Sequence, residues 1–143
     1  MPKMIFVNLP VRDLAASTRF YEALGCEKNP QFSDQNASSM VWSDTITIQL
    51  LTREYFATFA TRATADAHQT TEVMLALTLD SRAQVDAAAD AAAAAGGRAD
   101  VRAKMDMGFM YNRAVDDPDG HVLEFVWMDF EAATAEMAAA QGQ

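Results

Sequence analysis

Residues 4–25 read MIFVNLPVRDLAASTRFYEALG, an apolar segment followed by a helical pattern. The segment 4–11 is apolar with several β-branched residues, which predicts a strand. Asp13 is placed to cap a helix that runs to about Leu24, because apolar residues then recur at helical spacing. Gly25 then ends the predicted helix. The chain therefore opens with a strand and a helix.

The same order returns 68 residues later, where Leu79 superposes on Val11 and Met74 on Phe6. Residues 72–79 are again an apolar strand. Ser81 and Gln84 then have the form of a capping box before an alanine-rich helix that Gly96-Gly97 ends. This repetition predicts an internal duplication.

Three short strands are expected after each helix, separated by turn-forming residues such as Asp117-Pro118-Asp119-Gly120. The expected strands are 27–32, 38–42 and 45–51 in the first half, and 98–104, 109–115 and 121–128 in the second. The fold class is therefore α+β, built from two βαβββ modules. Module 1 spans about 1–52, a linker 53–70 with one or two helical turns, module 2 about 71–128, and a short helical tail 129–143.

Composition narrows the class of protein. The 143 residues suit a single domain, and half of them are hydrophobic. The net charge of −9 repels phosphate backbones and anionic lipids, so we expect neither nucleic acid nor membranes as partners. The single cysteine, Cys26, cannot form an intramolecular disulfide, and no signal segment precedes the first strand, which predicts a cytoplasmic protein.

Each sheet can bury only one face against its helix, so the other face is free to enclose a ligand. Because side chains alternate along a strand, Phe6 and Asn8 share one face of the first strand, and Gln49 lies in the polar row of the fourth. Met74 lies on the corresponding face of the fifth strand. Glu124 is the one carboxylate in an otherwise apolar last strand, where it requires a partner.

Three segments resemble the glyoxalase, bleomycin-resistance and extradiol-dioxygenase superfamily, known for the vicinal oxygen chelate fold: FVNLPVRDL at 6–14, RFYEALG at 19–25 and DPDGHVLE at 117–124. The resemblance implies a curved eight-stranded mixed sheet around a cleft, commonly in a homodimer. It also implies a lactoylglutathione-lyase-like member in which a divalent metal occupies four strand positions. Those positions correspond to Phe6, Gln49, Met74 and Glu124.

The residues at these positions argue against the metal. A hard cation prefers carboxylate or carbonyl oxygens and a borderline one prefers imidazole, whereas phenylalanine and methionine provide neither. Only Glu124, and weakly Gln49, could act as ligands. We therefore expect no tightly bound cofactor, although a divalent metal held by Glu124 with ligand atoms stays an alternative.

Several side chains have both a functional and a structural interpretation. Glu124 is either a general base or a carboxylate satisfied by Gln49 or an arginine. Tyr111 and Arg113 share a face and could contact the polar end of a ligand, while pairing of Arg113 with Glu124 or a surface acid is slightly favoured. Met107 lies in a methionine-rich segment that suits a pliable ligand wall or a core. The two histidines, His68 and His121, are expected to have no role in the site.

These observations predict a small-molecule binding protein with a degraded metal site, whose ligand has an apolar body and one polar end. The ligand-contacting residues are expected to be Phe6, Asn8, Gln49, Met74, Met107, Tyr111 and Arg113, with Glu124 as the candidate catalytic residue. One alternative is a lyase-like enzyme that uses Glu124 as base. Another is a structural dimer whose cleft is filled by its own side chains.

Overall fold

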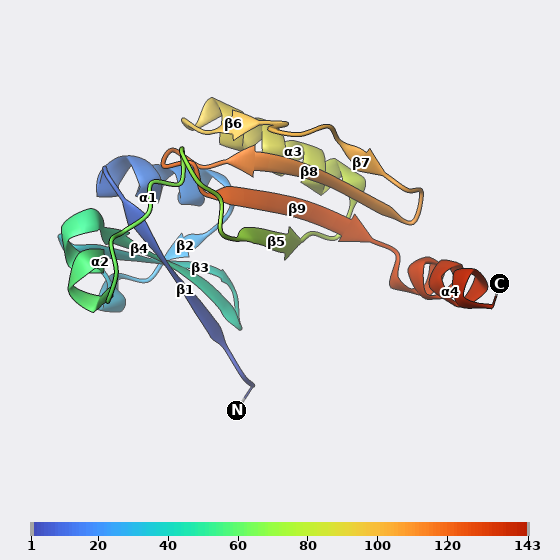
Figure 1. The fold of residues 1–143 in the computed structure, drawn as a ribbon, viewed down its shortest axis with the longest axis horizontal. Coiled ribbons are helices and arrows are strands. Elements are labelled where there is room, and N and C mark those ends of the chain that lie inside the picture. The colour runs from blue at the N-terminus through green and yellow to red at the C-terminus, as the bar shows by residue number, and fades with distance from the viewer. Residues whose placement is uncertain (1, 143) are drawn as a thin grey trace.

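The computed structural model describes residues 2–142 and contains the two predicted modules. Figure 1 shows one sheet and one long helix in each. Module 1 comprises β1 (Ile5–Val11), α1 (Leu14–Ala23), β2 (Glu27–Lys28), the 3₁₀ turn η1 (Pro30–Phe32), β3 (Ala37–Ser43) and β4 (Ile46–Thr52), followed by α2 (Arg53–Phe59). Module 2 comprises β5 (Met74–Thr78), α3 (Arg82–Ala94), β6 (Arg98–Ala99), β7 (Met105–Asp106), β8 (Met110–Asp116) and β9 (Val122–Met128), followed by α4 (Phe130–Gln141).

The sheet topology confirms the α+β fold and repeats in the two modules. The sheets have the orders β1-β4-β3-β2 and β5-β9-β8-β6, with β7 added to β8. In module 1 the first strand pairs in parallel with the last, so that Asn8 lies opposite Gln49. In module 2 the equivalent residues Ala76 and Glu124 are paired in the same way. The strands of residues 2–142 thus form two sheets, of four and five strands, instead of the single eight-stranded sheet that was expected, and β7 is additional to the eight expected strands.

Two predicted strands are much shorter than expected, each for a local reason. The segment 27–32 forms only two residues of strand because the Asn29 side chain accepts a hydrogen bond from Gln31 N at 3.1 Å and Pro30 begins a 3₁₀ turn. The segment 98–104 forms β6 and then leaves the sheet at Asp100, whose φ is 54°. The Asp100 carboxylate accepts two hydrogen bonds from Arg113, at 2.9 and 2.8 Å, which fixes that departure.

One hydrophobic core serves both modules. It collects the helix-facing rows of the two sheets together with buried residues of α1 and α3, such as Phe20 and Val85. The rings of Trp42 on β3 and Phe125 on β9 stack across the module boundary, with centroids 6.2 Å apart and planes at 23°. The modules therefore share one core.

The turn 117–120 joins module 2 to the first helix. The Tyr21 hydroxyl donates to Asp117 Oδ2 at 2.7 Å, and Ser17 donates to Asp119 Oδ2 at 3.2 Å. The backbone N–H of Arg12 also donates to Asp119, at 2.9 Å. Burial raises the pKa of Asp117, and burial with the nearby Asp117 carboxyl raises the pKa of Tyr21 well above its ordinary value. These bonds fix the orientation of α1 against module 2.

The linker runs along the boundary between the modules, whereas the C-terminal tail extends away from both sheets. After α2, residues 60–73 pass along the module boundary, where His68 Nε2 hydrogen-bonds with Pro118 O at 3.2 Å. The tail forms α4, which extends beyond the end of β9 and away from both sheets (Figure 1). In residues 2–142, no helix has the length and apolar character needed to span a membrane.

Candidate functional site

The open face of module 1 is the side of its sheet that points away from α1. Phe6, Asn8 and Gln49 lie on this face, and β1–β4 pairing brings Gln49 directly opposite Asn8. Phe6 is 56% exposed, whereas Leu9 and Ile48 on the other face are 6% and 1% exposed. The alternation expected from the sequence therefore holds in these strands.

A cavity of about 680 Å³ covers the open face of module 1. Phe6, Asn8 and Gln49 line it, together with Phe32 of η1. The Gln49 side-chain amide reaches across to donate to Phe32 O at 3.5 Å, a weak contact that leaves its carbonyl oxygen available. Apolar side chains next to three amide side chains, those of Asn8, Asn29 and Gln49, suit a ligand with an apolar body and one polar end.

The open face of module 2 is the corresponding side of the second sheet, and it carries Met74 and Glu124. Met74 is 58% exposed, and Ala76 lies opposite Glu124 in the parallel β5–β9 pair. The partly buried Glu124 carboxylate accepts a hydrogen bond from Arg102 and forms an ion pair with it. Arg102 and Met74 line a second cavity, of about 570 Å³, which is separate from that of module 1.

The four positions that the family resemblance implies for a metal do not suit a divalent cation. Phe6 has no donor atom, Met74 offers only a thioether, and Arg102 already pairs with the Glu124 carboxylate. Among residues 2–142, no group of three His, Cys, Asp or Glu side chains is arranged to hold a metal ion. Phe6 and Gln49 line one cavity, Met74 lines another, and Glu124 lines neither, so the four side chains do not surround one site.

Tyr111 and Arg113 lie on the face of the second sheet that packs against α3, which corrects their expected placement beside the ligand. The Tyr111 hydroxyl donates to Asp86 at 2.6 Å. Arg113 is 6% exposed and pairs with Asp86, Asp90 and Asp100 instead of Glu124. The carboxylates of a neighbouring helix can balance the charge of an arginine in a sheet. The aspartates of α3 are the sequence feature from which this pairing could have been predicted.

Met107 lies at the hairpin that joins β7 to β8. Its N–H donates to Met110 O at 2.8 Å, and Gly108 takes a φ of 80° that permits the tight turn. The Met107 side chain is 56% exposed at this end of module 2. Its contact with a ligand stays a prediction.

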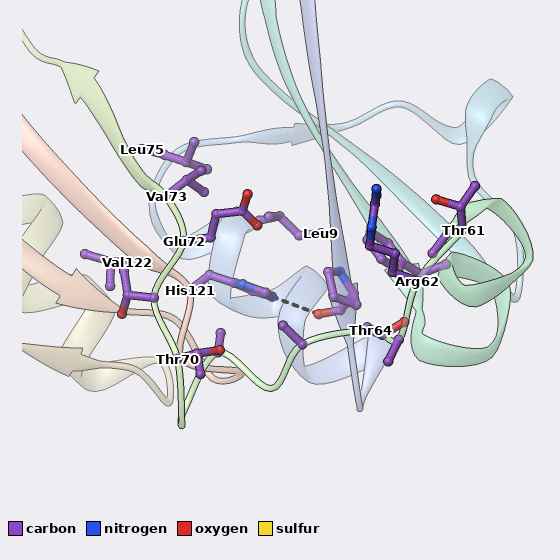
Figure 2. A pocket seen from close by; sticks show the side chains of 18 residues that line it. Leu9, Thr61, Arg62, Thr64, Thr70, Glu72, Val73, Leu75, His121 and Val122 are labelled. Atoms are coloured by element: carbon purple, nitrogen blue, oxygen red, sulfur yellow. Dashed lines mark hydrogen bonds between the residues drawn. The ribbon is translucent and has the colours of Figure 1, made fainter.

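Two further residues were not singled out as site residues by the sequence. Arg102 became apparent only through its pairing with Glu124, although a carboxylate in an apolar strand requires a cation nearby. His121, expected to have no role in the site, is half-buried and hydrogen-bonds through Nε2 with Pro10 O at 2.8 Å. Figure 2 shows this bond at the edge of a third cavity, which lies between the modules.

The paired βαβββ modules, each with one open sheet face, define a class of protein, and comparisons agree with that class. A model of the Glyoxalase/Bleomycin resistance protein/Dioxygenase superfamily matches residues 3–125. The chain therefore belongs to this superfamily. A search of curated proteins finds no match.

Solved structures show the same fold. A hypothetical protein from S. aureus is 26% identical with a TM-score of 0.74, and the match covers 89% of this chain and 94% of that one. A glyoxalase/bleomycin resistance protein/dioxygenase family enzyme from Burkholderia phytofirmans PsJN is 19% identical with a TM-score of 0.72, over 89% and 99% of the two chains. Fosfomycin resistance protein FosX from Mesorhizobium loti is 15% identical with a TM-score of 0.67, over 94% and 98%.

Proposed function

We propose that this protein binds a small molecule with an apolar body and one polar end on its open faces, without a tightly bound catalytic metal. The observation that carries the proposal is the pairing of Glu124 with Arg102 beside the exposed Met74. This arrangement offers an apolar surface and guanidinium N–H donors next to it. A guanidinium can grip the polar end of a ligand through its remaining donors.

We propose further that the protein acts as a cytoplasmic homodimer. Exposed apolar side chains gather on both open faces, including Met4, Phe6 and Phe32 in module 1, and Met74 and Met105 in module 2. Apolar surface of this kind is commonly covered by a partner or a ligand. The two open faces line separate cavities within one chain, so a second copy is the simplest way to bring such faces together.

Two alternatives are less well supported. In a lactoylglutathione-lyase-like enzyme, Glu124 would act as general base, but its carboxylate would first have to leave Arg102. In a purely structural dimer, side chains of the chain itself would fill the cavities. Open volumes of about 570 and 680 Å³ are of the size that small molecules occupy.

The first test combines metal analysis with a binding measurement. We expect protein purified without chelator to contain no stoichiometric metal, and nickel, zinc, iron or manganese to leave its melting temperature unchanged. 8-Anilinonaphthalene-1-sulfonate, an apolar probe with one anionic end, is expected to bind. Phe6→Asp and Arg102→Gln should each weaken its binding by about tenfold.

A matched control uses Phe59→Asp, because Phe59 is 66% exposed on α2 and lines none of the three cavities described. It should leave probe binding unchanged. A stoichiometric metal that disappears in Glu124→Ala would overturn the proposal in favour of a metal enzyme. Failure of the probe to bind would favour the structural dimer.

Sedimentation velocity at micromolar protein concentration tests the proposed homodimer, and a monomer under these conditions would contradict it.

A further inference from the structure

The third cavity, of about 600 Å³, is distinct from both open faces. It lies at the module boundary, between the end of β1, the linker and the turn that leads into β9 (Figure 2). Phe6, Gln49, Met74 and Glu124 are all absent from its lining. Ligand binding in this cavity is therefore independent of the function proposed above.

Its walls combine apolar side chains with a small number of polar groups. Leu9, Leu75 and Val122 provide apolar surface from three different strands. Glu72, His121 and Arg62 are the ionisable residues that line it. Ligand sites in proteins commonly have this size and this mixture of surfaces.

The hydrogen bond of His121 determines what its imidazole can offer a ligand. A carbonyl oxygen only accepts hydrogen bonds, so the 2.8 Å contact with Pro10 O requires the proton to be on Nε2. In the neutral imidazole, Nδ1 is then an acceptor. No hydrogen bond to His121 Nδ1 is formed within residues 2–142. The histidine therefore brings an acceptor to the cavity.

Glu72 brings a second acceptor. Glu72 is exposed at the rim of the cavity, is drawn above the His121 ring in Figure 2, and forms no ion pair with residues 2–142. Arg62 is exposed and is drawn on the opposite side of β1 from Glu72. The side of the cavity near β5 thus has a negative charge and two acceptors, with no basic side chain paired to the carboxylate.

We infer that this cavity binds an organic ammonium ion with a short apolar body. An ammonium group has three N–H donors and no acceptor, which matches the Glu72 carboxylate and His121 Nδ1. Its positive charge offsets that of Glu72. The apolar body lies against Leu9, Leu75 and Val122.

The experiment titrates pentylamine into the ¹⁵N-labelled protein and follows amide chemical shifts. We expect saturable shifts centred on the linker around Ala67 and on Gly120–Val122. Pentanoate and 1-pentanol, which share the apolar body, should bind at least about tenfold more weakly, because they lack the charge that Glu72 complements. Pentanoate binding as tightly as the amine would overturn the inference.

Two pairs of variants assign the binding to this cavity. Glu72→Gln should weaken pentylamine binding by about tenfold or more, and Glu54→Gln, at an exposed acid on α2, should not change it. Ala63→Trp should fill the exposed rim and block binding, whereas Ala57→Trp should not. Shifts centred on Phe6 or Met74 would overturn the inference, as would undiminished affinity in Glu72→Gln and Ala63→Trp with both folded.

Discussion

Glu124 illustrates how far a single residue can be interpreted before the fold is known. Its position in an apolar strand requires a compensating partner, and the structure provides Arg102. The strand pattern could not identify that partner, because Arg102 lies in an irregular segment after β6. The open face of module 2 therefore presents an ion pair of a carboxylate and a guanidinium, and not a lone carboxylate. The role of Glu124 toward a ligand depends on that pair.

The burial of Cys26 predicts that its thiol reacts slowly in the folded protein. The thiol is 5% exposed, and burial raises its pKa from 9.0 to about 12. Because the thiolate is the reactive form, Ellman's reagent at pH 8 should label the folded protein about a thousandfold more slowly than the urea-unfolded protein. Rapid labelling of the folded chain under these conditions would contradict the burial.

The same raised pKa determines the sign of an alkaline effect on stability. The folded state holds the thiol proton more tightly than the unfolded state, so this stabilisation is complete below about pH 9. It decreases as the pH rises toward 12. Tyr21, whose pKa burial also raises, acts in the same direction at higher pH. The free energy of unfolding should therefore fall above pH 9, which urea titrations at several pH values can measure.

At the scale of elements, the sequence predicted strands and helices well where periodicity and capping agree. Asp13 and Ser81 cap α1 and α3 as expected, with side chains that accept from Ala16 N and Gln84 N. The shortened strands after Lys28 and Ala99 were not predictable from periodicity. In both cases one polar side chain, that of Asn29 or Asp100, fixes a non-strand conformation through a specific hydrogen bond.

The attachment of α3 to β8 through Arg113 can be tested by substitution. Arg113→Met would leave Asp86, Asp90 and Asp100 close together without their cation. We expect a loss of about 1–3 kcal/mol in the free energy of unfolding, because the carboxylates are partly hydrated. Arg113→Lys should lose less, since it keeps the charge but not the two-pronged contact with Asp100. Urea unfolding at pH 7 measures both.

The pH dependence of that loss provides its control. The Tyr111 hydroxyl and Arg113 lower the pKa of Asp86, and Arg113 lowers that of Asp100. Groups with a lowered pKa stabilise the folded state above the unfolded value of 3.8, and this contribution is lost as the pH falls below it. The difference between wild type and Arg113→Met should therefore shrink in acid. A difference independent of pH would point to packing instead of charge.

Contact between the linker and the turn 117–120 depends on Gly120. Its φ is 89°, and a Cβ there would lie 2.8 Å from His68 N. Gly120→Ala should therefore lower the free energy of unfolding by about 2–4 kcal/mol, by adding a backbone clash to the conformational strain. Gly108→Ala is the matched control, because Gly108 has a φ of 80° but nothing within 4 Å of its Cβ position. Equal losses in the two variants, measured by urea unfolding, would mean that the linker contact contributes nothing.

At the scale of the whole molecule, the sequence predicted the duplication but not how the modules meet. Alternation along strands assigns each side chain to a face. Phe6, Asn8, Gln49, Met74 and Glu124 lie on the open faces, whereas Tyr111 and Arg113 lie on the face that packs against α3 and Met107 lies at the β7–β8 hairpin. Alternation cannot show that the two faces line separate cavities within one chain. That arrangement follows from contacts between distant residues, such as the stacking of Trp42 on Phe125.

The shared core predicts that the two modules unfold together. Trp42 lies in module 1 and Trp127 in module 2, and both pack against the same hydrophobic cluster. Trp42→Phe and Trp127→Phe each leave one tryptophan as a reporter on one module. In each variant, the urea midpoint from tryptophan fluorescence should coincide with that from circular dichroism, because a two-state transition gives the same midpoint with every probe. The two midpoints of a variant would separate if either module could keep its core without the other.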